Sequence, residues 1–215
     1  MASIYGFTEL LLTQEFNEAD RKDFLNTIYR QSELMISIIN ELLDLARIEA
    51  RQGKDFTLAR VDVRELLREI AAGFKTPDGR LSPLEPPANG PVWVRADRSK
   101  LTQAVSNVLS NAYKYSPNGG TVGVVLDDSP SVGDTPPRVG IRVTDEGIGM
   151  TPEQLARICE RFYRADTSGK IPGTGLGMSI VKEIITLHGG ELEVTSQAGT
   201  GSTVTLWLPN DASER

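Results

Sequence analysis

The sequence of 215 residues contains only one cysteine and one histidine. A single cysteine excludes an internal disulfide framework, so the composition does not indicate an oxidising compartment. A single histidine excludes any metal site that needs two imidazole ligands from one chain. Any chemistry that depends on histidine would have to use His188.

Long apolar segments are also lacking. No apolar run reaches the roughly 18–20 residues of a membrane-spanning helix, and no signal-peptide pattern is present. We therefore expect a soluble, cytoplasmic segment without membrane contact. The 29 Asp and Glu residues outnumber the 23 Lys and Arg residues, which gives a formal net charge of -6. This balance argues against binding to nucleic acid, although a local basic cluster could still bind an anion.

The first 53 residues show the pattern of two helices. Residues 3–16 are typical of the end of one helix, and a longer one is predicted over 20–50. Apolar residues recur along it in steps of three, four and seven, as in an amphipathic helix. Because the shorter helix cannot cover this stripe, we expect a homodimer in which two helical hairpins pair. Packing of the stripe on the rest of the chain is the alternative.

After residue 53 the pattern mixes helices and strands. Strands are predicted at 56–61, 92–96, 121–126, 138–144, 191–195 and 202–208. Helices are predicted at 62–72, 97–115, from residue 152, and at 176–188. Loops are expected at 73–91, which holds five of the 12 prolines, and at 127–137. We predict an α+β fold with two domains, a helical hairpin at 1–53 and helices layered on a mostly antiparallel sheet at 54–215.

Half of the 20 glycines lie between residues 145 and 201, in clusters at 145–150, 173–178 and 199–203. The second cluster precedes a predicted helix, whose N-terminus would offer N–H groups and a positive dipole end to a phosphate. Its spacing is neither that of a Walker A loop nor that of a Rossmann fingerprint. By itself it is a weak indication, and an ordinary turn is the alternative.

Three polar residues suggest a nucleotide. Asn107 and Asn111 lie one helical turn apart, and amide oxygens can ligate Mg²⁺. Asp145 ends an apolar strand, where its carboxylate could accept a hydrogen bond from an exocyclic amine such as that of adenine. Lys114 could meet a phosphate charge, and the Tyr115 ring could contact a base. The alternatives are ordinary caps or surface residues for the asparagines, and a turn cap for Asp145.

Taken in order, these segments resemble the C-terminal half of bacterial two-component sensor histidine kinases. Residues 107–116 are similar to the N box, 145–150 to the G1 box and 160–164 to the F box. Residues 173–178 are similar to the G2 box and 199–203 to a last, weaker box. The resemblance covers nearly the whole chain. It implies an α/β-sandwich ATP-binding domain of the Bergerat fold behind a dimerising helical hairpin.

The resemblance implies ATP and Mg²⁺ as cofactors and assigns roles to matching positions. Asn111, with Asn107, would hold Mg²⁺ against the phosphates, and Asp145 would bind the adenine amine. Residues between 161 and 173 would form a lid, and Thr203 would reach adenine through water. The other expected nucleotide-binding residues are Lys114, Tyr115, Gly147, Gly149, Arg164, Lys170, Gly173, Thr174, Gly175, Leu176 and Gly177.

The resemblance also implies a phosphoacceptor histidine in a box just before residues 3–7, where the sequence has none. We therefore expect the hairpin at 1–53 to be partial and this chain to have no catalytic residue of its own. It would donate the γ-phosphate of ATP to a histidine outside it, and the phosphate would pass to an aspartate of a response-regulator receiver domain. We expect His188 to be structural, a cation favoured by the C-terminal end of a helix.

Two other functions stay open. The first is another ATPase of the same fold, such as a serine kinase, a chaperone or a topoisomerase domain. The hairpin and the F box argue against it, and hydrolytic relatives usually place Glu where Asn107 stands. The second is an ATP-sensing interaction module without catalysis, which would keep the same boxes and dimerise. The sequence does not separate this module from a kinase.

Overall fold

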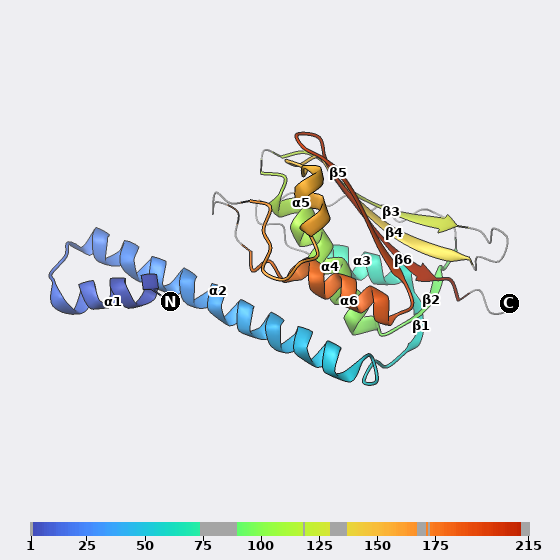
Figure 1. Ribbon diagram of the computed structural model, residues 1–215, viewed down its shortest axis with the longest axis horizontal. Coiled ribbons are helices and arrows are strands. Elements are labelled where there is room, and N and C mark those ends of the chain that lie inside the picture. The colour runs from blue at the N-terminus through green and yellow to red at the C-terminus, as the bar shows by residue number, and fades with distance from the viewer. Residues whose placement is uncertain are drawn as a thin grey trace. The chain divides into compact units, whose positions relative to one another are not determined.

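The computed structural model describes residues 2–73, 90–117, 119–129, 137–166, 171 and 173–211. Most of the two predicted loops at 73–91 and 127–137 lies outside these ranges. The chain divides into two compact units, Met1–Asp44 and Leu45–Arg215. Each unit is described by itself (Figure 1).

The first unit is helical. Helix α1 spans Ala2–Thr13 and lies beside the first turns of α2, which spans Glu18–Arg51 and continues into the second unit. The rings of Phe7 and Phe24 stack at 5.1 Å between centroids. Before Leu45 no residue of α2 is buried, and its exposed large apolar residues are Leu25, Tyr29, Ile36, Ile39, Leu42 and Leu43.

The second unit contains two antiparallel sheets. The larger has the strand order β3-β4-β6-β5 and the smaller pairs β1 with β2. The strands are β1 (Ala59–Asp62), β2 (Trp93–Ala96), β3 (Val122–Ser129), β4 (Arg138–Asp145), β5 (Glu191–Gln197) and β6 (Gly201–Pro209). The helices are the end of α2, α3 (Val63–Gly73), α4 (Arg98–Lys114), α5 (Pro152–Arg157) and α6 (Gly177–Leu187). The α+β prediction for this region is confirmed.

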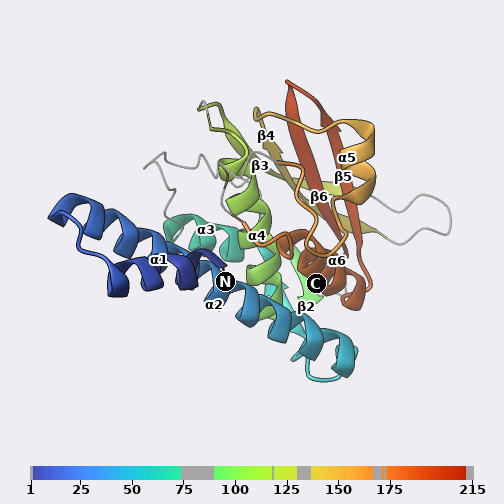
Figure 2. The same ribbon diagram turned by 60° about the vertical axis from the view of Figure 1, so that its left-hand side comes forward.

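Helices α4 and α6 cover one face of the larger sheet, as Figures 1 and 2 show. Side chains alternate along its strands, so every second residue faces these helices. The fully buried members of this core include Ile141, Leu206, Leu101, Leu109, Ile180 and Ile184. Burial of each such side chain contributes roughly 1.5–3 kcal/mol, which holds the two helices against the sheet.

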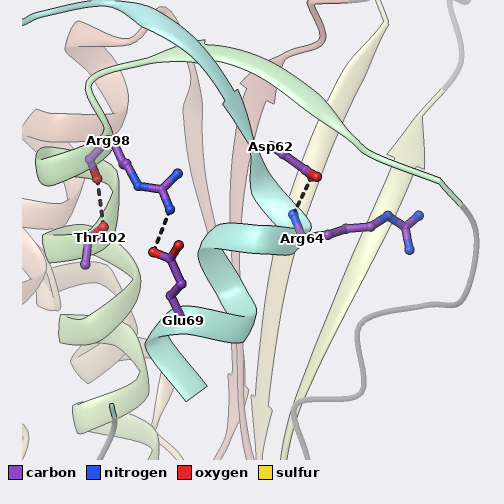
Figure 3. A network of polar contacts seen from close by, with 5 residues as sticks. All are labelled: Asp62, Arg64, Glu69, Arg98 and Thr102. Atoms are coloured by element: carbon purple, nitrogen blue, oxygen red, sulfur yellow. Dashed lines mark hydrogen bonds and ion pairs between the residues drawn. The ribbon is translucent and has the colours of Figure 1, made fainter. Parts of the chain in front are cut away.

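Acidic side chains define where two of these helices begin. Asp97 caps α4 by accepting the Lys100 N–H at 3.1 Å, as the sequence predicted. Asp62 accepts the Arg64 N–H at 3.0 Å at the start of α3 (Figure 3). Figure 3 also shows the ion pair of 2.5 Å between Arg98 of α4 and Glu69 of α3. Among the described helices, none has both the length and the apolar character that crossing a membrane requires.

Candidate nucleotide-binding site

A pocket with an empty volume of about 610 Å³ lies between α4, the start of α6 and the sheet. Its wall is mostly apolar and includes Val108, Ala112, Ile148, Met150, Met178 and Val204. The polar side chains that line it are Asn111, Tyr115, Asp145 and Ser202. A largely apolar ligand with a few polar groups fits such a lining.

Asp145 places a carboxylate among these apolar residues. It ends β4, is 8% exposed, and its Oδ1 accepts the Gly147 N–H at 2.9 Å. Burial raises the pKa of Asp145, while the N–H groups of Gly147 and Ser202 act in the opposite direction. A buried carboxylate of this kind gains much from a ligand that donates a hydrogen bond.

The glycines after Asp145 let three loops meet. A Cβ on Gly147 would lie 2.2 Å from the Tyr115 carbonyl oxygen, and one on Gly149 would lie 1.9 Å from that of Gln197. Gly149 also has a φ of +60°, which L side chains rarely adopt. We expected these glycines to bring the backbone close to a base. The close approach in the structure is between protein loops, and Gly149 lines the pocket as well.

Strand β6 brings Ser202 to the pocket, whereas the sequence pointed to Thr203. Ser202 pairs with Asp145 and lines the pocket, whereas Thr203 pairs with Thr144. The hydroxyls of Thr203 and Thr144 lie 3.2 Å apart, on the face of the sheet opposite the pocket. Thr203 is therefore not part of the pocket lining, because successive strand residues point to opposite faces. Its expected contact with adenine through water stays a prediction. The buried Leu206 and Leu208 lie at even steps along the strand from Ser202 and so face the same side of the sheet. This alternation in the sequence could have identified Ser202 as the residue that faces the pocket.

The end of α4 supplies several expected residues. Asn111 and Tyr115 line the pocket, while the lining does not include Asn107 or Lys114, which are half-buried. Burial raises the pKa of the Tyr115 hydroxyl, and the positive charge of Arg164 acts against this shift. The negative charge of Asp166 acts in the same direction as burial.

The second glycine cluster brings the N-terminus of α6 to the same place. A Cβ on Gly177 would lie 3.9 Å from Asn111 Nδ2, and no side chain caps the helix at Leu176. The Leu176 N–H donates to Thr174 Oγ1 at 3.2 Å. The Leu176 side chain is fully buried, so this residue can offer only its backbone to a ligand. Gly175 packs against the backbone of Phe162.

The segment after α5 contributes charged groups. Arg164 donates to the Ile171 carbonyl and lies 3.7 Å from Asp166. Arg161 forms an ion pair with Glu49 near the end of α2. Lys170, an expected phosphate contact, lies outside the described residues. Among the residues that the structure describes, none has an atom within 4 Å of the position of a Cβ on Gly173.

His188 differs from its expected state. Its Nε2 accepts the Asp97 N–H at 2.9 Å, and its Nδ1 lies 2.7 Å from the Ile184 carbonyl oxygen. An accepting Nε2 requires the neutral ring with the proton on Nδ1. Burial also lowers the pKa of His188. The expectation of a cation is wrong, because desolvation outweighs the attraction of the helix end.

Two protein-family models match the chain. Residues 96–212 match the histidine kinase-, DNA gyrase B-, and HSP90-like ATPases, and residues 1–51 match the His Kinase A (phospho-acceptor) domain. The first match covers more than half of the sequence, so the chain belongs to this family of ATPases. Together the matches give the domain arrangement of a sensor histidine kinase.

Several proteins with similar sequences are named histidine kinases. The chain is 34% identical over 191 residues to sensor histidine kinase WalK of Bacillus subtilis, covering 86% of this chain and 30% of WalK. It is 33% identical over 213 residues to histidine protein kinase DivJ of Caulobacter vibrioides, covering 96% of this chain and 34% of DivJ. The chain thus spans about a third of the length of these curated relatives. The crystal structure of full-length ShkA in complex with AMPPNP matches with a TM-score of 0.67 and 27% identity, over 97% of this chain and 42% of ShkA.

The match at residues 1–51 conflicts with one expectation. We expected the phosphoacceptor box to be missing and the hairpin to be partial, yet this segment matches the phospho-acceptor domain. The expectation rested on one residue type in a short motif, whereas the similarity extends over both helices. The sequence itself still contains no histidine other than His188.

Proposed function

We propose that this chain binds Mg-ATP in the pocket at the ends of α4 and α6, and donates its γ-phosphate to a histidine. The observation that carries the proposal is the Asp145 carboxylate, buried in an apolar pocket beside an uncapped helix N-terminus. Such a pocket suits a purine whose amine meets the carboxylate, while the phosphates meet the helix end. The AMPPNP in the related ShkA structure supports this choice of ligand.

Each part of the site would then have a separate task. Asp145 would accept the adenine amine, and Ser202 would help to fix the base. The backbone N–H groups that begin α6 at Gly177 would bind phosphate oxygens. Lys114, Arg164 and, from the expected set, Lys170 would add positive charge, and Thr174 with Gly173 would shape the loop. Phosphoryl transfer depends mostly on such positioning and charge.

The donor set fits Mg²⁺ better than a transition metal. In the described ranges no group of three His, Cys, Asp or Glu side chains could hold a metal ion. Mg²⁺ needs only one or two protein oxygens when it also binds phosphates and water. The amide oxygens of Asn111 and Asn107 would supply these ligands. Bound Mg²⁺ would neutralise phosphate charge.

The phosphate acceptor would come from another polypeptide region than residues 1–215. The one histidine of the sequence is 7% exposed and both of its ring nitrogens are engaged. A phosphoacceptor needs a free ring nitrogen at the surface. This chain alone should therefore bind ATP without phosphorylating itself, and a response-regulator aspartate would be the later acceptor.

The N-terminal helices would pair two copies of the chain. The exposed large apolar residues of α2, such as Ile36, Ile39 and Leu43, form a stripe suited to another helix. Sedimentation should report a dimer at micromolar concentration. A monomer would contradict this part of the proposal.

Two measurements test the proposed function. A fluorescent ATP analogue should bind in the presence of Mg²⁺, and failure to bind would refute the nucleotide site. Labelled ATP is then mixed with this chain and a separate helical hairpin that carries an acceptor histidine. Label on that histidine supports the kinase. Binding without transfer would instead favour an ATP-sensing module, the second candidate, which a sequence with His188 as its one histidine also fits.

A further inference from the structure

Three separate parts of the second unit meet at His188. The ring accepts the Asp97 N–H at 2.9 Å, and its Nδ1–H donates to the Ile184 carbonyl at 2.7 Å. The Phe56 ring packs on the imidazole with 5.0 Å between centroids. Residue 56 belongs to the exit segment, residues 52–57, which follows α2. His188 thus contacts α4, α6 and the chain that leaves α2.

Asp97 completes this junction. Its Oδ2 accepts the Thr57 N–H of the exit segment at 2.8 Å, and its Oδ1 accepts from Ser99 Oγ at 2.6 Å and from the Lys100 N–H at 3.1 Å. These bonds lower the pKa of Asp97 against the effect of its burial. The Asp97 carboxylate therefore binds both the exit segment and the first turn of α4. The backbone N–H of Asp97 in turn donates to His188.

The junction lies at the far end of both helices of the nucleotide site. Asp97 precedes Asn111 by 14 residues of α4, about 21 Å, and Gly177 precedes His188 by 11 residues of α6, about 16 Å. The helices are antiparallel, because Asp97 meets His188 at one end and Gly177 lies by Asn111 at the other. Figure 1 shows the two helices side by side. The His188 junction and the nucleotide site therefore lie at opposite ends of the same pair of packed helices.

We infer that His188 is a positioning residue: its neutral ring fastens the exit segment of α2 to α4 and α6, and so sets the spacing of Asn111 and Gly177 around the nucleotide. The inference rests on the proposed nucleotide site. Protonation of Nε2 removes the acceptor of the Asp97 N–H and places two donors face to face. Acid therefore opens the junction and weakens nucleotide binding from a distance.

The direction of the pH effect follows from the groups around the ring. Asp97 is the charged group that acts on His188, from the loop before α4, and it favours the cation. The Ile184 carbonyl of α6 also favours the cation, and the exit segment places the apolar Phe56 ring against the imidazole. Burial lowers the pKa of His188 by more than Asp97 and Ile184 together raise it. Because the pKa of His188 is lowered on folding, the junction is complete above the ordinary pKa of about 6.5 and opens as the pH falls through the lower folded value.

The test compares two substitutions in the full chain. His188→Gln keeps an acceptor and a donor that do not titrate, and His188→Leu keeps bulk and removes both. Affinity for a fluorescent ATP analogue with Mg²⁺ is measured from pH 7.5 to 5. At pH 7.5 we expect His188→Leu to weaken binding about tenfold and His188→Gln to weaken it less than about twofold. On acidification the wild type should lose affinity more steeply than His188→Gln. Thr186→Ala, an exposed change on the same helix end, is the control.

Hydrogen exchange separates positioning from loss of stability. In His188→Leu the amides of Thr57 and Asp97 and those around Asn111 should exchange faster, while β4 stays protected. Equal affinities for His188→Leu and the wild type, or equal pH slopes for His188→Gln and the wild type, would overturn the inference. If the wild type binds no ATP analogue, the proposed function fails. In that case hydrogen exchange alone tests the positioning role of His188. Unchanged exchange around Asn111 in His188→Leu would overturn that role.

Discussion

Replacing Asp145 with Asn tests the nucleotide site most directly. The carboxylate is buried in an apolar pocket and its Oδ1 accepts the Gly147 N–H. An Asn side chain has nearly the same shape and can keep that bond through its amide oxygen. The change therefore removes charge from the site and leaves the loop geometry in place.

The expected loss is set by one charge-assisted hydrogen bond. Such bonds contribute about 1.5–3 kcal/mol, which corresponds to roughly 10- to 150-fold weaker ATP binding by Asp145→Asn. The substitution should not lower the free energy of unfolding, although it weakens ATP binding. Because burial raises the pKa of Asp145, its charged form costs stability above the folded pKa, and this cost disappears as the pH falls through that value. The free energy of unfolding of Asp145→Asn at pH 7 should equal or exceed that of the wild type.

Calorimetric titration with ATP and with inosine triphosphate gives the sharpest readout, since the latter carries a carbonyl in place of the adenine amine. The wild type should prefer ATP, and Asp145→Asn should lose most of that preference. Asp127→Asn, on the edge strand β3, is the matched control and should keep it. An unchanged preference in Asp145→Asn, with the fold intact in urea unfolding, would refute the assignment of Asp145 to the adenine amine.

Three further predictions concern neighbouring positions. Gly149→Ala should lower the free energy of unfolding by about 2 kcal/mol or more, because the added Cβ would collide with the Gln197 carbonyl and the φ of residue 149 is positive. Urea unfolding measures this, and a stability equal to that of the wild type would contradict the packing of these loops. Ser202→Ala should weaken ATP binding by about 1 kcal/mol, whereas Thr203→Ala should leave it unchanged, and the reverse result would contradict the register of β6. Asn111→Ala should weaken ATP binding about tenfold with Mg²⁺ and by less than about twofold in EDTA, as measured by fluorescence titration; equal losses in both would exclude a magnesium ligand.

Much of the fold could be predicted because its causes are local. The apolar period over 97–115 predicted α4, found at Arg98–Lys114, and Asp97 was expected to cap it. The glycine clusters marked the loops that meet around the pocket. The predicted strand at 56–61 begins only at Ala59, because Phe56 and Thr57 are held instead by His188 and Asp97. Those partners lie far along the chain, where local propensity has no influence.

The sequence by itself determined the family, the order of the helices and strands, and the identity of Asp145 and Asn111 as candidate ligands. These follow from periodicity, capping and motif spacing, which act over a few residues. Only the tertiary structure decided that His188 is neutral, because its partner Asp97 lies 91 residues away and both are buried together. The pairing of β6 with β4 likewise put Ser202 in the pocket and Thr203 outside it. Burial and long-range hydrogen bonds set the charge and direction of a side chain, and they exist only once the chain has folded.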